Sequence, residues 1–390
     1  MPQKSRYTLA SLTLAALTLA ACGGGGNSSN SDDDSAGDGN QNNGVTTLTV
    51  DATAGGFGTP ADDPANRYTY LDLSTGEVVD IDDAEADDSG AWHIAFKRTS
   101  IKLNGGISGP GSVGAALLDE QSEFYAADGS PNASVFLNAD PDAELSALTE
   151  ATAPADLEFE TDQRAAAIAG DGSEEGWWLY DRASHTVSAN TDAWWLVRTA
   201  EGDGYAKFHV TGIDQNAIDV SVAYQYQAPG TASFTGGTRT ATLTVPPEGG
   251  QTCFDFDTGS SVDCEETAGT WDIQLDIAER RWALWTNGGV SGDRQAAAFG
   301  PVNDPQRYPS GTTDISGTDI SGHYNADAAG GVFDEQSWYA YNLQDQHRLW
   351  PNYRVYAIDT DETTYKLQIV TYYDAAGTSG IYTLRYAPIE

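Results

Sequence analysis

Histidines are the scarce side chains of this sequence that can bind a metal or move a proton near neutral pH. The 390-residue chain has five histidines and no methionine other than Met1. His185 and His347 each lie in a loop between two segments rich in tryptophan and tyrosine, and His323 lies in a glycine-bounded loop upstream of the second such pair. A loop histidine of this kind either caps a turn or presents a nitrogen ligand above an apolar wall. The residue pattern leaves both interpretations open.

The two other histidines fit structural roles better. His93 and His209 each alternate with apolar residues in segments that have the pattern of half-buried strands. We therefore expect both side chains to lie on the polar, solvent-facing side of their strands.

No catalytic signature is present in the sequence. It has no Gly-x-Ser-x-Gly turn, no His-Glu-x-x-His pair, no phosphate-binding glycine loop and no free thiol beside a histidine. Its 58 Asp and Glu residues are too numerous for any two to be singled out as a catalytic acid and base. We therefore expect a protein that is not an enzyme.

The charge balance excludes one large class of partners. The formal net charge is −39 at pH 7. Nucleic-acid binding requires clustered Lys and Arg residues that neutralise phosphates, so nucleic acid is excluded as a natural partner. The same charge disfavours direct binding to anionic lipid.

A processing signal occupies residues 1–22. A basic start precedes an apolar run that is too short to span a bilayer, and the run ends in Leu-Ala-Ala-Cys at Cys22. This ending is similar to the lipobox of bacterial lipoproteins, in which the cysteine is acylated and anchors the protein to the membrane. Residues 23–44 contain no large apolar residue and are predicted to form a flexible tether. Because Gly23 follows Cys22, we expect an outer-membrane lipoprotein, with either the periplasmic or the surface face left open.

The other two cysteines, Cys253 and Cys264, flank an Asp-Thr-Gly turn. Two strands that leave a tight turn bring facing residues within the roughly 4.4–6.8 Å that a disulfide needs between Cα atoms. Export to an oxidising compartment favours their oxidation. We predict a Cys253–Cys264 disulfide.

The chain repeats its own motifs in the same order. Residues 70–80 resemble residues 253–263, and the later Asn104-Gly105-Gly106 block returns at Asn287. Solenoid repeats are roughly 20–50 residues long, so a repeat this much longer indicates two whole domains. Alternating apolar residues separated by turn signals predict strands throughout. We predict two tandem antiparallel all-β domains of the same fold, residues 45–229 and 235–390, with the second copy divergent.

Residues 92–109 (WHIAFKRTSIKLNGGISG) and the preceding 70–79 (YLDLSTGEVV) closely resemble the signature of HmuY-like haem-binding lipoproteins. The resemblance covers nearly all of the first copy and, more weakly, all of the second. It implies an all-β, lipid-anchored protein that captures haem with two axial ligands, His or Met, from two loops. One such loop precedes the paired aromatic strands and the other lies between them.

Carried over to this sequence, the resemblance places His185 and His347 in the second ligand loop of the first and second copies. His323 occupies the first ligand loop of the second copy, where the first copy has neither His nor Met. The resemblance therefore implies that His323 and His347 bind haem in the second domain, and that the first domain, with His185 alone, binds weakly. Haem is then the expected ligand, with no other metal, and an outer-membrane haem receptor is the expected further partner in iron acquisition.

Two other classes of function remain open on the sequence. The many Trp and Tyr residues would also suit a structural or carbohydrate-adhesive surface module in which the rings stack on sugars. A hydrolase has only unassigned carboxylates in its favour.

Overall fold

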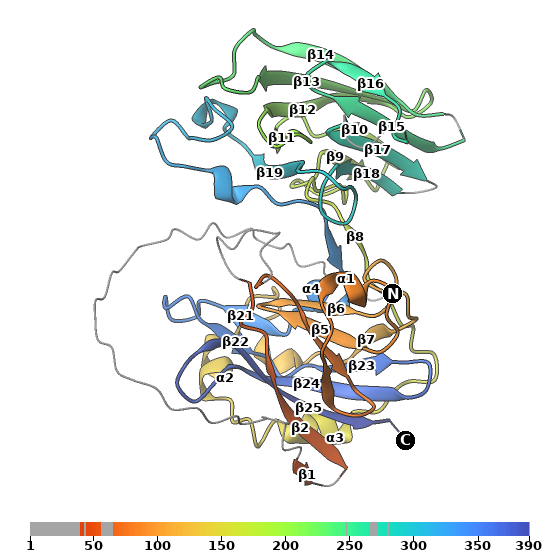
Figure 1. Ribbon diagram of the computed structural model, residues 1–390, viewed down its shortest axis with the longest axis vertical. Helices are drawn as coiled ribbons and strands as arrows, with labels where there is room; N and C mark the ends of the chain where they lie inside the picture. Colours follow the sequence, from red (N-terminus) through yellow and green to blue (C-terminus); the bar gives the residue numbers. More distant parts are fainter. Residues whose placement is uncertain are drawn as a thin grey trace. The chain divides into compact units, whose positions relative to one another are not determined.

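The computed structural model describes residues 40–42, 44–55, 65–246, 248–265, 271–278 and 281–389. The predicted signal peptide, its Cys22 and almost all of the predicted tether lie outside the described residues. The chain forms two compact units (Figure 1): unit 1 combines the residues up to 163 with those from 330 onward, and unit 2 is residues 164–329. Strands make up 44% of the chain and helices 9%, which confirms the predicted all-β class.

The described part of unit 1 contains two antiparallel sheets and a short hairpin. The larger sheet has the order β1-β2-β25-β24-β23-β7, with strands at Asn40–Asn42, Val45–Asp51, Ser379–Pro388, Thr364–Tyr373, Val355–Asp359 and Gly114–Asp119. The smaller sheet has the order β4-β3-β5-β6, with strands at Glu77–Val79, Thr69–Asp72, Ile94–Lys97 and Ser100–Leu103. The hairpin pairs β21, Tyr339–Tyr341, with β22, Leu349–Pro351.

Short helices fill the connections of unit 1. They are α1 (Asp83–Ala86), η1 (Ser122–Phe124), α2 (Ala133–Asn138), α3 (Leu145–Glu150) and α4 (Val332–Glu335). Among the described residues, no helix is long and apolar enough to cross a membrane.

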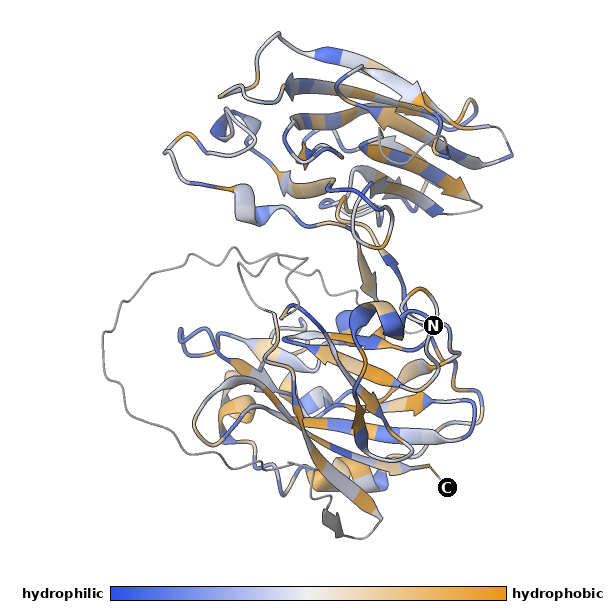
Figure 2. Cartoon of the chain, in the orientation of Figure 1, coloured by the Kyte–Doolittle hydropathy of each residue, from blue (hydrophilic) through white to orange (hydrophobic). Residues whose placement is uncertain are grey.

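The strand β5 shows how the core of unit 1 is built. Ile94 and Phe96 point into the main core, where the Phe96 ring lies 5.0 Å from that of Tyr382. The opposite face of this sheet is also buried, because Trp92 and Tyr70 pack there with α1 above them. Figure 2 shows apolar and polar residues mixed along the strands of both units.

Unit 2 also contains two antiparallel sheets and a hairpin among its described residues. The larger sheet has the order β14-β13-β12-β11-β19, with strands at Arg239–Thr244, Asp219–Gln227, Tyr205–Asp214, Trp194–Arg198 and Ala297–Val302. The smaller sheet has the order β16-β15-β17-β18, with strands at Ser260–Val262, Gly250–Asp255, Ile273–Ala278 and Arg281–Thr286. The hairpin pairs β9, Trp178–Asp181, with β10, Thr186–Ala189.

Two short helices and one pair of short strands complete the described elements of unit 2. η2 spans Pro305–Arg307 and η3 spans Ser321–His323. The strands β8, Gln163–Ala165, and β20, Ala328–Gly330, pair with each other where the chain passes from one unit to the other.

The compact units do not coincide with the two predicted domains. The predicted join at residues 229–235 lies inside unit 2, between β13 and β14. Residues 45–229 and 235–390 therefore each contribute strands to both units. The physical reason is that the local residue pattern determines where a strand forms. It does not determine with which of two similar sheet edges that strand pairs.

The predicted disulfide is present in unit 2. Cys253 and Cys264 are bonded, with their Cα atoms 5.2 Å apart. Cys253 lies on β15 opposite Val262 of β16, so the bond closes the hairpin around the turn that the sequence singled out.

Candidate functional site

The β9–β10 hairpin of unit 2 presents His185 at its turn. The backbone of His185 has φ +55°, and its side chain is exposed. A 2.8 Å hydrogen bond joins its Nδ1 to the hydroxyl of Tyr180 on β9. Asp181 holds the turn in shape by accepting the backbone N–H of Ala183 at 2.7 Å.

The β21–β22 hairpin of unit 1 presents His347 in the same way. His347 also has φ +55° and is also exposed. Its Nδ1 lies 2.7 Å from the hydroxyl of Tyr341 on β21, and its backbone N–H donates to Asn342 Oδ1 at 2.8 Å.

The tyrosine contact gives both hairpin histidines a defined orientation. With the imidazole proton on Nδ1, facing the tyrosine oxygen, Nε2 carries the lone pair that a metal ligand needs. Ligating histidines usually have their other ring nitrogen held by a hydrogen bond of this kind. The same contact also serves a purely structural brace, so the geometry fits both interpretations that the sequence left open.

His323 is placed differently, at the end of η3 in unit 2. Its ring packs edge-on against Phe299 of β19, with the centroids 5.3 Å apart. Its Nδ1 is buried and has no hydrogen-bond partner. A buried imidazole nitrogen without a partner is costly.

The structure divides the histidines that the sequence paired. His323 lies in unit 2, whereas His347 lies in unit 1, so no single unit contains the predicted pair. His185 lies in unit 2 with His323. Unit 2 therefore holds two of the three candidate ligands and unit 1 holds one.

The two histidines expected to face solvent are both partly buried. His209 stacks on Trp194, with ring centroids 3.8 Å apart and 11° between the planes, and its Nδ1 lies 2.9 Å from the Thr191 carbonyl oxygen. The Nδ1 of His93 accepts the backbone N–H of Leu73 at 3.1 Å. This stack was not predicted from the sequence. It results from the pairing of β11, which carries Trp194, with β12, which carries His209.

The cations near the sequence signature are used inside unit 1. The ammonium of Lys102 lies 4.6 Å from the ring centroid of Tyr68, and that of Lys97 lies 4.4 Å from the same ring. Burial lowers the pKa of both lysines. Arg98 donates to the carbonyl oxygens of Gly55 and Ser379. These three side chains brace the fold.

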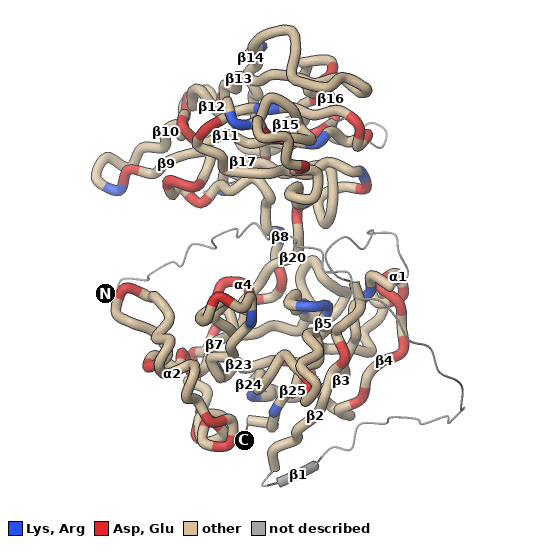
Figure 3. Tube along the Cα trace, turned by 90° about the vertical axis from the view of Figure 1, so that its left-hand side faces the viewer, with Lys and Arg blue, Asp and Glu red and all other residues tan. Residues whose placement is uncertain are grey.

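Other cations accompany the histidine hairpins. Arg182 is exposed in the same turn as His185. Arg348 follows His347 and lies 4.5 Å above the ring of Tyr373. Acidic residues otherwise dominate the charged side chains of both units (Figure 3).

Buried carboxylates bind backbone groups in unit 2. Asp272 accepts the N–H groups of Ala200 at 2.7 Å and Phe256 at 2.8 Å, and burial raises its pKa to about 7. Asp327 accepts the N–H groups of Ala167 and Thr286, each at 2.8 Å. Within the part of the chain that the structure describes, no three His, Cys, Asp or Glu side chains form a metal cluster.

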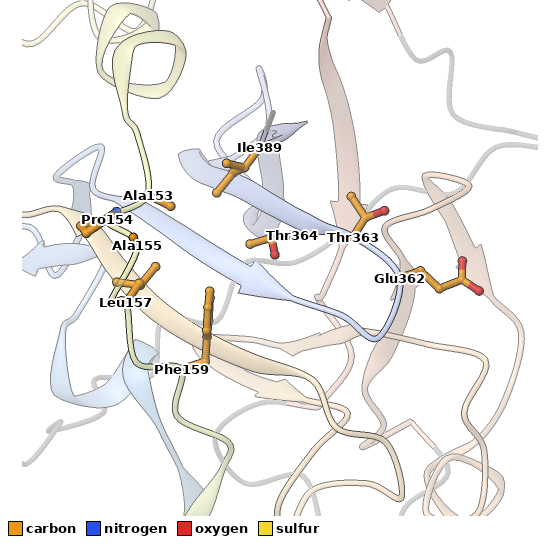
Figure 4. Close-up of a pocket in the computed structure, with 9 residues that line it drawn as sticks. All are labelled: Ala153, Pro154, Ala155, Leu157, Phe159, Glu362, Thr363, Thr364 and Ile389. Carbon is orange, nitrogen blue, oxygen red and sulfur yellow. The ribbon is translucent and has the colours of Figure 1, made fainter.

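A pocket of about 420 Å³ lies in unit 1, and no histidine lines it (Figure 4). Leu157, Phe159 and Ile389 give it an apolar wall, and Glu362 lies at its rim. None of its lining residues is a His, Met, Cys or Tyr. It therefore offers no iron ligand of the expected kind.

The comparison with protein families matches one continuous segment of the chain. The model of the HmuY protein family matches residues 65–227. This segment is similar to that family. The matched segment runs from ahead of β3 to the end of β13 and includes His185.

Two solved structures share a general likeness with the whole chain. A Bacteroides fragilis protein named as a lipoprotein is 13% identical, covering 90% of this chain and 93% of its own, with a TM-score of 0.32. A Bacteroides vulgatus protein named as an HmuY-like heme-binding protein is 13% identical, covering 89% and 93%, with a TM-score of 0.30. At these scores the likeness carries no argument. No curated protein matches the chain.

Proposed function

We propose that this protein captures haem without transforming it. The observation that carries the proposal is the HmuY family match over residues 65–227, which contains the exposed His185 on its hairpin. The absence of any catalytic motif in the sequence fits a carrier and not an enzyme.

The proposed ligands are the imidazoles of His185, His323 and His347. Neutral imidazole is an ordinary axial ligand of haem iron. Unit 2 is the better candidate because two of these histidines belong to it, and one of them, His185, is held by Tyr180. His347 would give unit 1 a single ligand and weaker binding.

The haem propionates must be accommodated by a strongly acidic protein. Their negative charges would be repelled by a net charge of −39 unless cations lie close to the bound ligand. Arg182, in the turn of His185, is the cation best placed in sequence for this role.

A haemin titration followed by absorbance tests the proposal. We expect the chain without residues 1–22 to give a low-spin spectrum. His185→Ala and His323→Ala should each convert it to a high-spin spectrum, because losing one of two axial ligands leaves iron five-coordinate or water-ligated. Binding should weaken on the order of 10–100-fold, the range typical of damage to a metal's ligand environment.

His347→Ala is the matched control, since His347 has the same hairpin position, exposure and tyrosine contact as His185. It should leave the low-spin spectrum of the chain unchanged. A loss of low-spin character in His347→Ala but not in His185→Ala would instead favour the pair implied by the sequence. If haemin absorbance never changes, the haem proposal fails and a structural or adhesive role gains ground.

We also propose that the chain is anchored through Cys22 in the outer membrane, where a haem receptor would be its partner. The support is the Leu-Ala-Ala-Cys ending and the absence of Asp after Cys22. Cys22→Ser should move the protein from the membrane fraction to the soluble fraction. Unchanged membrane retention would contradict the anchor.

A further inference from the structure

Each larger sheet is completed by a strand from the other half of the chain. In unit 1, β7 of the first predicted copy pairs with β23 of the second. In unit 2, β19 of the second predicted copy pairs with β11 of the first. Neither copy pairs its own strand at this position.

The two cross-copy pairings have matching registers. Ala115 lies opposite Ile358 in unit 1, and Ala298 lies opposite Val197 in unit 2. The equivalence of Ala115 and Ala298 is independent of these pairs, because each also bridges to the loop that follows, at Glu160 and at Asn325. Both pairings shift register near the start of the partner strand, before Tyr356 and before Leu196.

The turn glycines also contact residues of the other copy. Gly76, in the β3–β4 turn, has φ +74°, and a Cβ there would collide with the hydroxyl of Tyr386. Gly259, in the β15–β16 turn, has φ +69°, and a Cβ there would collide with the hydroxyl of Tyr224. In each unit the glycine comes from one copy and the tyrosine from the other.

The cores are shared between the copies as well. In unit 1, Phe96 of the first copy packs on Tyr382 of the second. In unit 2, Phe208 of the first copy packs on Phe256 of the second, with ring centroids 5.6 Å apart. The HmuY match also crosses from unit 1 to unit 2, at residue 163. A segment matched by one family model is therefore divided between two compact bodies.

We propose that the two predicted copies, residues 45–229 and 235–390, are each other's binding partners, with their C-terminal halves exchanged. Each copy supplies its N-terminal strands to one unit and its C-terminal strands to the other. The interaction surface is the edge of β7, or of β19, together with the core behind it. The partner of this surface is the C-terminal half of the other copy. The proposal does not depend on haem binding.

The segment that joins the copies offers a direct test. Gly236 and Gly237 lie in the exposed connection between β13 and β14, both have positive φ, and a Cβ at either would meet no atom within 4 Å. A specific protease site inserted between them can be cut in the folded chain without disturbing a core residue.

After complete cleavage, we expect the two fragments to elute together from a size-exclusion column at the mass of the uncut chain. They should separate only in denaturant. Tandem domains that fold within each copy would instead separate under native conditions, because no other covalent link joins them: the Cys253–Cys264 disulfide lies within the second fragment. Separation into two folded monomers would overturn the proposal.

A pair of cysteines distinguishes exchange from nonspecific association of the cut fragments. Ala116 lies opposite Ala357 across β7 and β23. Facing residues in antiparallel strands are close enough for a disulfide, so Ala116→Cys with Ala357→Cys should link the two cut fragments. The control combines Ala116→Cys with Leu196→Cys, the position that would face residue 116 if the first copy folded on itself. Oxidation of the control pair in place of the first would refute the exchange.

Discussion

Residues 164–329, produced as a separate protein, should fold cooperatively, whereas residues 235–390, a segment of similar length, should not. The first segment contains the whole of unit 2, with both sheets, the β9–β10 hairpin and the disulfide. Its ends lie on the paired strands β8 and β20, so the excised chain begins and ends at neighbouring positions.

The second segment lacks strands of the larger sheet in each unit: β11, β12 and β13 in unit 2, and β1, β2 and β7 in unit 1. It would expose β19 without β11 and the back of the smaller sheet without Phe208 and Tyr224. Burial of each such aromatic contributes about 1.5–3 kcal/mol, and a domain is typically stable by only about 5–15 kcal/mol in total. Losing several of them at once removes most of the stability of the unit.

Urea denaturation followed by near-ultraviolet circular dichroism checks this expectation. Residues 164–329 should give one sigmoidal transition and residues 235–390 a spectrum without fixed aromatic signals. A folded, monomeric 235–390 fragment would mean that a copy can close on itself. The fragment contains both β19 and β23, so two molecules of it could pair β19 of one with β23 of the other, and its mass should be checked for dimers.

How far the sequence predicts this fold depends on the range of the contact. The hairpins of β15–β16 and β21–β22 were predictable, because their turn residues and alternating strands are local. The Cys253–Cys264 disulfide follows from the same local pattern. The partner of β7 was not predictable. The equivalent strand β19 pairs with β11 in a matching register, so nothing in the local pattern favours β23 over β11 as the partner of β7.

The candidate site shows the same limit. His185 and His347 were predicted in loops between aromatic strands, and both occupy hairpin turns. Their grouping depends on which strands pair at long range, and the structure puts His323 in the unit of His185 and not in that of His347. His93 was expected on an exposed face, yet its ring accepts a backbone N–H of a neighbouring loop. An alternating pattern does not reveal the elements that cover the polar face of a sheet.

Asp327→Ala should be one of the most damaging single substitutions among the carboxylates of unit 2. The carboxylate of Asp327 is nearly inaccessible to solvent and accepts the backbone N–H groups of Ala167 and Thr286. Removing it leaves two buried donors without partners, and each such group costs about 1–3 kcal/mol. We expect the free energy of unfolding to fall by about 2–6 kcal/mol, seen as a lower urea midpoint of the full chain.

Asp214→Ala is the matched control, because it too removes a carboxylate that accepts two backbone N–H groups, those of Asn216 and Ala217. Asp214 is exposed in the β12–β13 turn, so water replaces the lost acceptor and the loss should stay below about 1 kcal/mol. The two sites differ in burial and in the sequence separation of the groups that the carboxylate joins. Equal losses in the two variants would show that the hydrogen bonds themselves, and not the burial of Asp327, set the cost. That result would mean that burial does not explain the effect of losing Asp327. The N–H groups of Ala167 and Thr286 would then have found other acceptors, or water, in the variant.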